Sequence, residues 1–564
     1  MSDSEGENED PNPVRAASPF LYSRFERQSY GSYDECLAAF KDKVAKVDDV
    51  WVLLTDKASD PYKMVSAKKF ADSNSTLQYS EQNKGKYVNK QFIGRFMKEG
   101  RLNGDRVFRQ FGMYSDPGAC PEDVFNLWTP FAVKEMTAKG DSDEHIDDLA
   151  FLLRHLFILS GRSQVSTRTN PPCSIVRSLA LHALQVLYDH VLDWNTHFFK
   201  YPDIKSHMLC FIGGQGCGKS IIFGDTETNL GLLGNMMGKS KFFTTAEPET
   251  YVWGKFNSIM ASAYYVNLNE VGNFTHVGNV NKGVGTLKAL IKGKEMTINA
   301  KGLSHVKTQS LAKYVYTANP NDGVNIPTED SERRYVVIRC SDELCLGTFE
   351  GAPVKDYFSK LARLVEDPVL LRDFYDFLML RPVPKTFHKD DMPVSNFQQQ
   401  LNAANRDPID QWLSSLTWRE GATTMQLSNK SSWHLFRQYC ESESIPLRVS
   451  VQQFKNQLAA RSFCSSYRSS SIRGHVIDRE GLKCALPPAP EEQGSQDPEP
   501  NFKAIVTDFF TQRLVAEIAA DPKAWKAARK AESKKRRQER LAQERVRKQK
   551  REEAAYEAMA AAHA

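Results

Sequence analysis

The sequence predicts an α/β protein whose core carries a phosphate-binding loop, and three stretches support this prediction. Residues 213–220 read GGQGCGKS, and they lie between the apolar segment HMLCFI and the segment SIIFGD, which can begin a helix. Further along, AYYVNLNE ends in an acid and AKYVYTAN ends in an amide. Short apolar runs of this kind are typical of buried strands. The pattern therefore indicates a sheet with polar groups at the ends of its strands.

The part of the chain before this core shows no catalytic motif. Residues 1–19 contain five acids together with several Pro, Ser and Asn, and are predicted to be disordered. Residues 20–140 are predicted to form an N-terminal α+β domain, in which DVWVLL and RVFRQFGMY are extended and KQFIGRFMKEG is a short helix. Residues 141–200 have Leu, His and Phe at helical spacing, which predicts a helical bundle and a candidate oligomerisation collar. Its histidines, His155 among them, are interpreted as core or surface residues rather than metal ligands.

The glycine-rich loop has the spacing GxxxxGK[ST], in which successive backbone N–H groups at a helix N-terminus surround the phosphates of a nucleotide. Lys219 is predicted to reach the β and γ phosphates, and the Ser220 hydroxyl to coordinate Mg²⁺. The alternative is a glycine-rich turn that matches by chance. Cys217 is interpreted as a small space-filler rather than a nucleophile. The predicted nucleotide-binding residues are Gly213, Gly214, Gln215, Gly216, Cys217, Gly218, Lys219 and Ser220.

The strand AYYVNLNE ends at Glu270, where a nucleotide hydrolase places the carboxylate that orients or deprotonates the attacking water. The preceding residue is Asn269, whereas many such sites have an Asp that serves Mg²⁺. An Asn can hold a metal-bound water as a neutral acceptor, but it contributes a weaker field at the metal. We therefore predict a magnesium site formed by Ser220, Asn269 and Glu270, and weak or absent hydrolysis stays open as an alternative.

The next segment, TLKALIKGKEMTINAKGLSHVK, predicts a helix followed by a hairpin that carries several lysines. Lys288 and Lys301 are candidate contacts to a phosphodiester backbone, because such contacts need charge and reach rather than base-specific geometry. A solvated basic surface is an equally good interpretation. Asn319, at the end of the strand in AKYVYTANPNDG, can sense a γ phosphate and position water, or can mark an ordinary turn before Pro320.

Paired arginines, Arg333 and Arg334, stand directly before the predicted strand in SERRYVVIRC. A guanidinium fixed at this point could reach a nucleotide held by a neighbouring subunit and stabilise the charge that develops during phosphoryl transfer.

The C-terminal part predicts a nucleic-acid-binding module followed by a basic tail. Residues 400–484 suggest a winged-helix-like domain with a helix in SSWHLFRQYCES, a helix in SVQQFKNQLAARS capped by Ser450, and a wing that carries Arg468 and Arg473 for duplex or fork contact. A small packing domain is the alternative. Residues 485–502 are predicted to be a Pro-rich linker, and residues 503–564 a basic helical tail.

The net charge of +5 is unevenly distributed. Residues 523–551 contain fourteen Lys and Arg but three Glu, so the rest of the chain is slightly acidic. A stretch within this tail is a candidate for nuclear import or nucleic-acid binding, and a solvated charged helix is the alternative. The residues of this stretch are Lys534, Lys535, Arg536 and Arg537.

The composition excludes several classes of protein. Of the 564 residues 41% are hydrophobic and 25% charged, which is ordinary for a globular protein. No apolar run is long enough to cross a bilayer, and the acidic start differs from a secretory or mitochondrial presequence. We therefore expect an intracellular protein without a membrane partner, in the nucleus or in a viral replication compartment. The ten cysteines include no CxxC pair and no zinc-like spacing, so we expect no structural zinc.

In their order along the chain, these motifs resemble the superfamily 3 helicases of viruses and mobile elements, whose motor is an AAA+ ATPase assembled as a ring. The sequence is most similar to the helicase domain of poxvirus and giant-virus primase-helicases and of phage primase-polymerases. The segments EDVFNLWTPF and GKFN are similar to stretches of that group, and the likeness extends from Asp123 to Cys340. It implies that residues 201–385 form an AAA+ P-loop ATPase and helicase domain.

The resemblance also implies roles for single residues. ATP and Mg²⁺ would be bound at the subunit interfaces of a homo-hexamer, and single-stranded and forked DNA would be the partners. Lys219 and Ser220 would bind the nucleotide and the metal, Glu270 would be the catalytic carboxylate, and Asn319 would be the sensor. Lys301 would be the pore lysine that pulls DNA. Arg333 or Arg334 would be the arginine finger that acts in trans.

The main functional hypothesis from the sequence is an ATP-dependent DNA helicase for replication of a viral or mobile-element genome. Two alternatives stay open. One is a P-loop ATPase that remodels or packages nucleic acid without unwinding it. The other is a non-catalytic nucleic-acid-binding scaffold that binds ATP structurally, and Asn269 is the residue that supports it.

Overall fold

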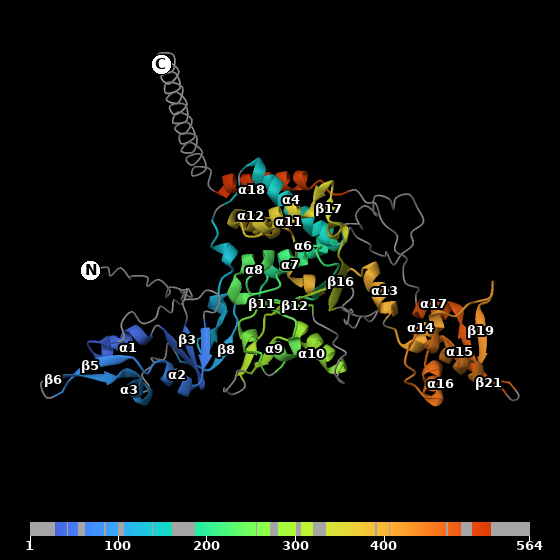
Figure 1. The fold of residues 1–564 in the computed structure, drawn as a ribbon, viewed down its shortest axis with the longest axis horizontal. Helices are drawn as coiled ribbons and strands as arrows, with labels where there is room; N and C mark the ends of the chain where they lie inside the picture. The colour runs from blue at the N-terminus through green and yellow to red at the C-terminus, as the bar shows by residue number, and fades with distance from the viewer. Residues whose placement is uncertain are drawn as a thin grey trace, which may run out of the picture. The chain divides into compact units, whose positions relative to one another are not determined.

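The computed structural model describes most of the chain. The described residues are 29–41, 43–54, 62–83, 86–99, 107–137, 139–140, 142–160, 186–254, 256–270, 280–299, 306–319, 334–389, 392–404, 406–469, 472–486 and 499–520. They form a mixed α/β structure with many helices and several sheets, which confirms the predicted class (Figure 1). The chain divides into two compact units, one of residues 1–139 with 152–498 and the other of residues 140–151 with 499–564.

A five-stranded parallel sheet carries the glycine-rich loop. Its strands are β10 (Met208–Ile212), β11 (Phe242–Thr245), β12 (Tyr265–Asn269), β15 (Lys313–Ala318) and β16 (Tyr335–Arg339). Their order across the sheet is β11-β12-β15-β10-β16. Strands β10 and β15 are buried along their whole length, because both faces of a parallel sheet are covered by helices. The carboxyl ends of all five strands therefore meet at one edge, with β15 between β10 and β12.

Helices cover both faces of this sheet. In Figure 1, α7 (Lys219–Phe223) and α8 (Gly231–Met237) are drawn above strands β11 and β12, and α9 (Pro248–Tyr251) and α10 (Val280–Lys292) below them. Helix α12 (Pro368–Leu380) packs against α6 (Val186–Lys200) and α8. The remaining helices around this core are α4 (Asp143–Leu159), α11 (Val354–Leu364) and α13 (Asn396–Ala404), and a short hairpin joins β17 (Thr348–Phe349) to β18 (Ala352–Pro353).

The lysine-bearing segment forms the predicted hairpin. Strand β13 (Glu295–Ile298) pairs antiparallel with β14 (Val306–Gln309), and Lys301, which follows β13 in the sequence, is outside the described residues. Strand β14 also pairs with β8 (Gln110–Gly112), which in turn pairs with β9 (Val124–Asn126). The hairpin is therefore part of a four-stranded sheet whose other two strands come from a distant part of the sequence. The sequence did not predict this pairing.

The N-terminal region surrounds a core of aromatic side chains. Trp51 stacks on Phe70 with ring centroids 4.0 Å apart, and Phe40 and Phe96 lie edge to face at 4.9 Å. Such pairs add to the free energy gained from burying the rings. The helices of this region are α1 (Tyr33–Lys41), α2 (Ala67–Ser73) and α3 (Phe92–Glu99). One sheet contains β1 (Ser29–Tyr30), β5 (Gln78–Asn83) and β6 (Lys86–Gln91). The other contains, in sheet order, β4 (Tyr62–Val65), β3 (Val50–Leu54), β2 (Val44–Val47) and β7 (Val107–Phe108).

Residues 406–486 gather around another hydrophobic cluster, in which Trp412, Phe436 and Phe454 are buried. Ser450 begins α16 with a capping box, as its side chain accepts from the Gln453 N–H and the Gln453 side chain accepts from the Ser450 N–H. The helices are α14 (Pro408–Ser414), α15 (Asn429–Ser442), α16 (Val451–Ala459) and α17 (Arg479–Ala485), and the strands, in sheet order, are β19 (Thr424–Ser428), β21 (Ile472–Asp478) and β20 (Cys464–Ser469). Strand β19 was not predicted from the sequence.

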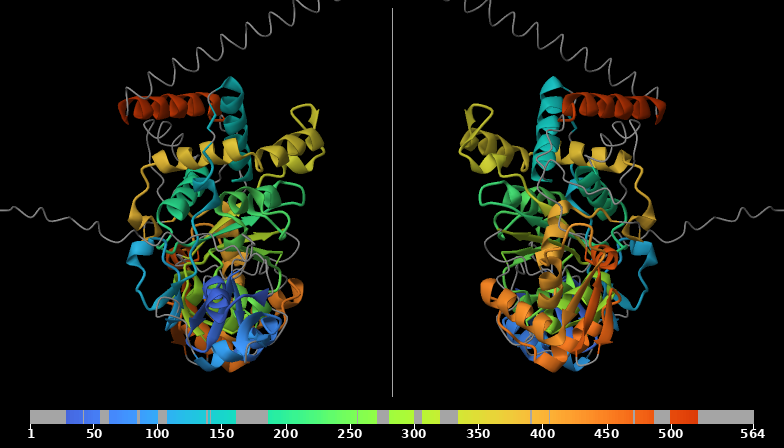
Figure 2. Two further views of the ribbon diagram at one scale, coloured as in Figure 1. Left: turned by 90° about the vertical axis from the view of Figure 1, so that its left-hand side faces the viewer. Right: turned by 90° about the vertical axis from the view of Figure 1, so that its right-hand side faces the viewer.

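The smaller unit contains α18 (Phe502–Ala520) and residues 140–151, which include the start of α4. Lys503 Nζ lies 2.7 Å from Asp147 Oδ1, and Arg513 donates to the carbonyl of Gly140. Figure 2 shows α18 against the start of α4 in both views. The tail residues Lys534, Lys535, Arg536 and Arg537 lie outside the described residues.

Among the described helices, none has both the length and the apolar character that crossing a bilayer requires.

Buried histidines predict that the fold loses stability in mild acid. Burial lowers the pKa of His155 from 6.5 to about 4, and lowers that of His207 well below its ordinary value. The unfolded chain therefore binds protons below about pH 6.5 that the folded chain does not, and each histidine costs about 1.4 kcal/mol of stability per pH unit until its folded pKa is reached. We expect the urea concentration at the midpoint of unfolding to be lower at pH 5.5 than at pH 7.5. This difference should be smaller in the His155→Gln protein.

An exposed histidine provides the control for this experiment. His434 lies on the surface of α15, so His434→Gln should lose as much stability in acid as the unmodified protein. If His155→Gln and His434→Gln lost the same amount of stability between pH 7.5 and pH 5.5, the contribution assigned to His155 would be contradicted.

Candidate functional site

The glycine-rich loop connects β10 to α7 at the carboxyl edge of the parallel sheet. Gly216 and Gly218 have φ of 90° and 97°, a left-handed conformation that glycine adopts without a steric cost. A Cβ at Gly213 would lie 2.5 Å from Cβ of Cys340, and one at Gly218 would lie 2.4 Å from Cε1 of His155. Side chains at these positions would therefore push the loop away from its supports. The loop is held close to the sheet and exposes its backbone, which suits the binding of phosphate.

Lys219, the first residue of α7, folds back over the loop. Its Nζ donates to the carbonyl oxygens of Gly213 at 2.7 Å and Gly214 at 3.1 Å. It also donates to Oδ1 of Asn319 at 3.3 Å. The ammonium group is thus placed above the loop, where an anion would replace uncharged acceptors as its partner.

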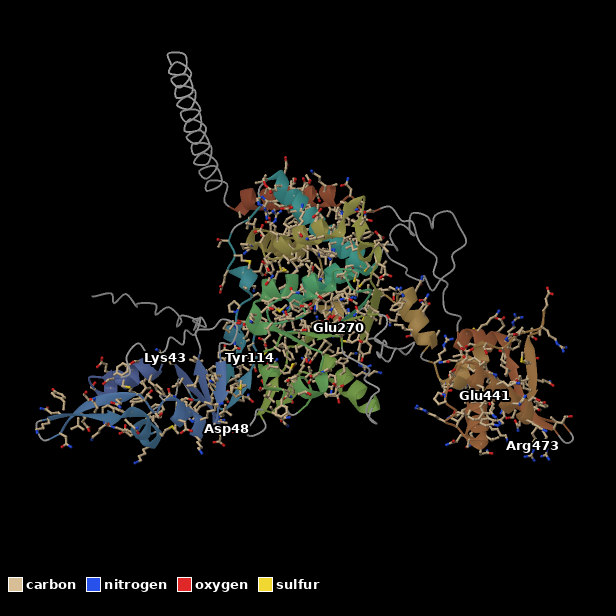
Figure 3. The ribbon with its side chains drawn as sticks, in the orientation of Figure 1. Lys43, Asp48, Tyr114, Glu270, Glu441 and Arg473 are labelled. Carbon is tan, nitrogen blue, oxygen red and sulfur yellow. The ribbon has the colours of Figure 1, made fainter. Side chains whose placement is uncertain are left out.

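Asn319 joins this cation to the carboxylate of Glu270. Its Nδ2 donates to Glu270 Oε1 at 3.1 Å, while its Oδ1 accepts from Lys219. Asn319 follows β15, which lies between the strand of the loop and the strand that ends before Glu270. Strand order therefore places the amide between the two charged groups. Figure 3 labels Glu270 at the end of β12.

The backbone at Glu270 has a left-handed φ of 48°, which is uncommon for a residue other than glycine. Its N–H donates to the carbonyl of Thr317 at 2.8 Å, so the turn is tied to β15. The side chain is exposed. A carboxylate held in this way can meet both solvent water and the Asn319 amide.

Asn269 takes part in a hydrogen-bond network behind the site. The Thr317 hydroxyl lies 2.9 Å from Asn269 Oδ1 and 3.1 Å from Asn267 Oδ1. Because a hydroxyl has one proton, it donates to one of the two amides at a time. The Asn267 side chain donates in turn to the carbonyl of Gly224 at 2.6 Å. An oxygen of Asn269 is thus oriented toward β15 by Thr317.

The donor set fits a magnesium nucleotide in its chemistry. Ser220, Asn269 and Glu270 offer oxygen atoms, which are the ligands that Mg²⁺ prefers. The loop supplies backbone N–H groups and the Lys219 ammonium for phosphate. The neutral amide of Asn269 leaves Glu270 as the charged group of the predicted metal set.

Asp342 and Arg339 are neighbours of the loop that sequence reasoning missed. Asp342 Oδ1 accepts from the Gly214 N–H at 3.3 Å, and its other oxygen lies 3.5 Å from Nη2 of Arg339. Arg339 ends β16 and is in register with Ile212, the residue directly before the loop. A carboxylate here opposes the binding of an anion unless its charge is balanced, and Arg339 supplies the balance. No local pattern in SDELC signals this arrangement.

His155 supports the loop from behind. It is fully buried, its Nδ1 lies 3.2 Å from the hydroxyl of Tyr357, and its ring faces Gly218. Because its pKa is lowered by burial, the imidazole stays neutral at physiological pH. The sequence left a core or a surface position open for this histidine, and the structure places it in the core, beside the glycine-rich loop.

Among the residues that the structure describes, Arg334 and Lys288 do not join this cluster. The carbonyl of Arg334 accepts from the N–H of Met208, so Arg334 stands at the amino edge of the sheet. With a rise of about 3.3 Å per residue along β10, its backbone is about 15 Å from the loop of its own chain. Arg333 and Lys301 lie outside the described residues. Lys288 lies on α10.

Arg468 and Arg473 face each other across the β20–β21 pair and are both exposed (Figure 3 labels Arg473). Their guanidinium groups are therefore open to solvent at the predicted wing.

Comparison with known proteins gives similarities to part of the chain. Residues 211–334 match a protein family described as a family of unknown function (DUF5906). The chain is 24% identical over 155 residues to the DNA primase-polymerase of Nitratiruptor phage NrS-1, a match that covers 27% of this chain and 20% of that protein. The chain thus matches about a fifth of the length of this curated relative. This similarity confirms the predicted likeness to a phage primase-polymerase, and membership of superfamily 3 stays a prediction.

Two solved structures of the NrS-1 C-terminal region are also similar in fold. The A-form apo structure has a TM-score of 0.47 and 14% identity, and the match covers 77% of this chain and 96% of that one. A second apo structure of the region gives a TM-score of 0.47 and 14% identity, covering 77% of this chain and 95% of that one.

Proposed function

We propose that the protein is a replication enzyme, namely an ATP-dependent DNA helicase with an AAA+ P-loop motor of the superfamily 3 type. The observation that carries this proposal is the contact series from Lys219 through Asn319 to Glu270. It joins a phosphate-binding cation, a polar amide and a carboxylate at one edge of a parallel sheet. The strand order, with β15 inserted between β10 and β12, supports a nucleotide hydrolase of this type.

Each of these residues has a distinct task in the proposed hydrolysis of ATP. The loop N–H groups and Lys219 bind and orient the phosphates. Glu270 accepts a proton from the attacking water, and Asn319 keeps this carboxylate pointed toward the loop. Mg²⁺, when bound, would neutralise charge on the phosphate oxygens, and Ser220, Asn269 and Glu270 are the residues proposed to hold it.

The position of Arg334 supports a site completed by a second copy of the chain. Its backbone lies at the opposite edge of the sheet from the loop of its own chain. An arginine at that edge can serve a nucleotide bound by a neighbouring subunit in a ring. We propose a homo-hexamer in which Arg333 or Arg334 acts in trans.

Two basic elements are proposed to contact DNA. The sequence between β13 and β14 contains Lys301, and β14 of this hairpin pairs with β8. The helix and strand order of residues 406–486 supports a winged helix, in which the β20–β21 wing presents Arg468 and Arg473 to the phosphate backbone. The similar phage protein is a DNA primase-polymerase, which supports DNA rather than RNA as the substrate.

One observation favours a different function, a scaffold that binds ATP without splitting it. Asn269 is neutral, and its amide oxygen is already engaged by Thr317. A site with less negative charge holds Mg²⁺ less firmly, so turnover would be slow. A remodelling or packaging ATPase that shares the motor but does not unwind is the other alternative.

An unwinding assay on forked DNA tests the proposal. The unmodified protein should displace a strand only when ATP is present, and single-stranded DNA should stimulate hydrolysis. Lys301→Ala should lose this stimulation while basal turnover persists, because a hairpin lysine grips the phosphate backbone and not the nucleotide. Lys294→Ala, which removes an exposed lysine at the base of the same hairpin, is the matched control and should behave like the unmodified protein.

The outcomes separate the three functions. Hydrolysis without strand displacement would favour a remodelling ATPase. Nucleotide binding without turnover would favour the scaffold. Full stimulation in Lys301→Ala would contradict the role proposed for the hairpin.

A further inference from the structure

Three cysteines from separate parts of the sequence surround the first two glycines of the loop. A Cβ built at Gly213 would lie 3.2 Å from Sγ of Cys217 and 3.2 Å from Sγ of Cys340. A Cβ built at Gly214 would lie 3.1 Å from Sγ of Cys345. Each of the three is a free thiol. Since Gly213 has no side chain, the thiols of Cys217 and Cys340 border the same small space, and Cys345 borders the space beside Gly214.

Cys217 and Cys340 come from the loop and from the end of the neighbouring strand. Both sulfur atoms border the space beside Gly213, and the N–H of Cys340 donates to the carbonyl of Ile212 at 2.8 Å. Cys340 directly follows β16, the neighbour of β10 in the sheet. A bond between the two sulfurs would therefore tie the middle of the loop to the end of the next strand.

The surroundings of the pair favour a thiolate on one partner and a thiol on the other. Lys219 Nζ lies 3.6 Å from Sγ of Cys217. The hydrogen bond from Cys340 and the charge of Lys219 outweigh burial and lower the pKa of Cys217 to about 6. Burial and the nearby Cys217 raise the pKa of Cys340 well above its ordinary value. A thiolate is the nucleophilic form, so Cys217 is the sulfur that meets an oxidant first.

We propose that Cys217 and Cys340 are a redox-sensitive pair that disables the phosphate-binding loop when peroxide oxidises it. In the first step the Cys217 thiolate attacks hydrogen peroxide, which forms a sulfenic acid and releases hydroxide. In the second step the Cys340 sulfur attacks the sulfenic sulfur, and the oxygen leaves as water. The two thiols lose two electrons and two protons to give a disulfide, and one peroxide becomes two waters.

The disulfide would change the loop because its geometry is strict. The two thiols are free, and an S–S bond of about 2.05 Å is much shorter than any non-bonded approach of two sulfur atoms, so the loop between Gly213 and Cys217 has to move toward β16. The backbone N–H groups then no longer converge on one phosphate. The inference rests on the proposed nucleotide binding only for this consequence, and the formation of the disulfide is independent of it.

Nucleotide binding and oxidation should oppose each other. Cys217 itself is 1% exposed, but its neighbours Gln215 and Gly216 are exposed, so a molecule as small as peroxide approaches through the loop. A nucleotide covers this route and draws Lys219 toward phosphate. By linkage, bound ATP should disfavour the disulfide at equilibrium by the same factor by which the disulfide weakens ATP binding. Because the nucleotide covers the route to Cys217, it should also slow the oxidation.

The test treats the full-length reduced protein with hydrogen peroxide, with and without ATP and Mg²⁺. Disulfides are mapped by differential alkylation and mass spectrometry, and nucleotide binding is followed with a fluorescent ATP analogue. We expect a linkage between Cys217 and Cys340, a loss of nucleotide affinity of tenfold or more, recovery with dithiothreitol, and slower oxidation when ATP is bound. Cys345→Ser should respond as the unmodified protein does. Cys340→Ser, an isosteric change outside the loop, should form no such linkage and show no loss that dithiothreitol reverses.

Two results would overturn the inference. One is a Cys217 that stays reduced or pairs with Cys345 in the unmodified protein. The other is a protein that carries the Cys217–Cys340 bond and still binds nucleotide with unchanged affinity. A protein that forms the bond but does not bind nucleotide even when reduced would contradict the proposed function and leave the pair itself established.

Discussion

The Lys219→Ala protein is expected to lose ATP hydrolysis, with turnover at least about a hundredfold below that of the unmodified protein, which is the cost of removing one key electrostatic group from a site of this kind. In the structure the ammonium lies over the loop, 2.7 Å and 3.1 Å from two of its carbonyl oxygens. Without Lys219, the loop loses the ammonium group that would balance the negative charge of the phosphates. Phosphate release and the binding of a fluorescent ATP analogue measure the two effects.

The control for this experiment is a lysine that carries the same charge but lies away from the loop. Lys239 is exposed after α8, and Lys239→Ala should leave turnover and nucleotide affinity unchanged. Circular dichroism and thermal melts show whether the Lys219→Ala fold is intact. Unimpaired turnover in a folded Lys219→Ala protein would refute the phosphate-loop assignment.

Glu270→Gln is expected to separate binding from chemistry. Glutamine keeps the oxygen that accepts from Asn319 Nδ2, so the local geometry should persist, but it cannot take a proton from water. Because Glu270 is also a proposed Mg²⁺ ligand, nucleotide affinity is compared without Mg²⁺, and there we expect it to stay within about threefold of the unmodified protein. Turnover should be lower by about 10² to 10⁴, the usual contribution of a general base. Single-turnover hydrolysis together with equilibrium binding measures both quantities.

The matched control is Glu249→Gln, because Glu249 is an exposed acid on α9. It should have no effect on either quantity. If Glu270→Gln retained full turnover, the general base would have to be another group. A protein that is inactive before any substitution would instead favour the scaffold function, for which neutral Asn269 is the structural argument.

Several elements were predictable because local chemistry specifies them. The loop needs glycines where the backbone is left-handed, as at Gly216 and Gly218, and strands β10, β12 and β15 are apolar runs of ordinary strand length. The β13–β14 hairpin and the capping box at Ser450 follow from short patterns of the same kind. These features depend on residues within a few positions of one another.

Other elements depend on contacts that no local pattern contains. The pairing of β14 with β8 joins residues nearly two hundred positions apart, as Thr308 and Phe111 show. Strand β19 belongs to a sheet whose partner strand, β21, begins after α16. Asp342 and His155 reach the loop from segments that read as an ordinary loop and an ordinary helix.

The sequence by itself determined that the protein contains a glycine-rich loop after a buried strand, followed by a strand that ends at an acid and a strand that ends at an amide. Only the tertiary structure decided which of these ends meet. Because β15 is inserted between β10 and β12, Asn319 contacts both Lys219 and Glu270. The same packing brings Cys340 to Cys217 and places Arg334 at the far edge of the sheet. The order of parallel strands is set by how the whole sheet packs against its helices, and short-range sequence preferences do not specify it.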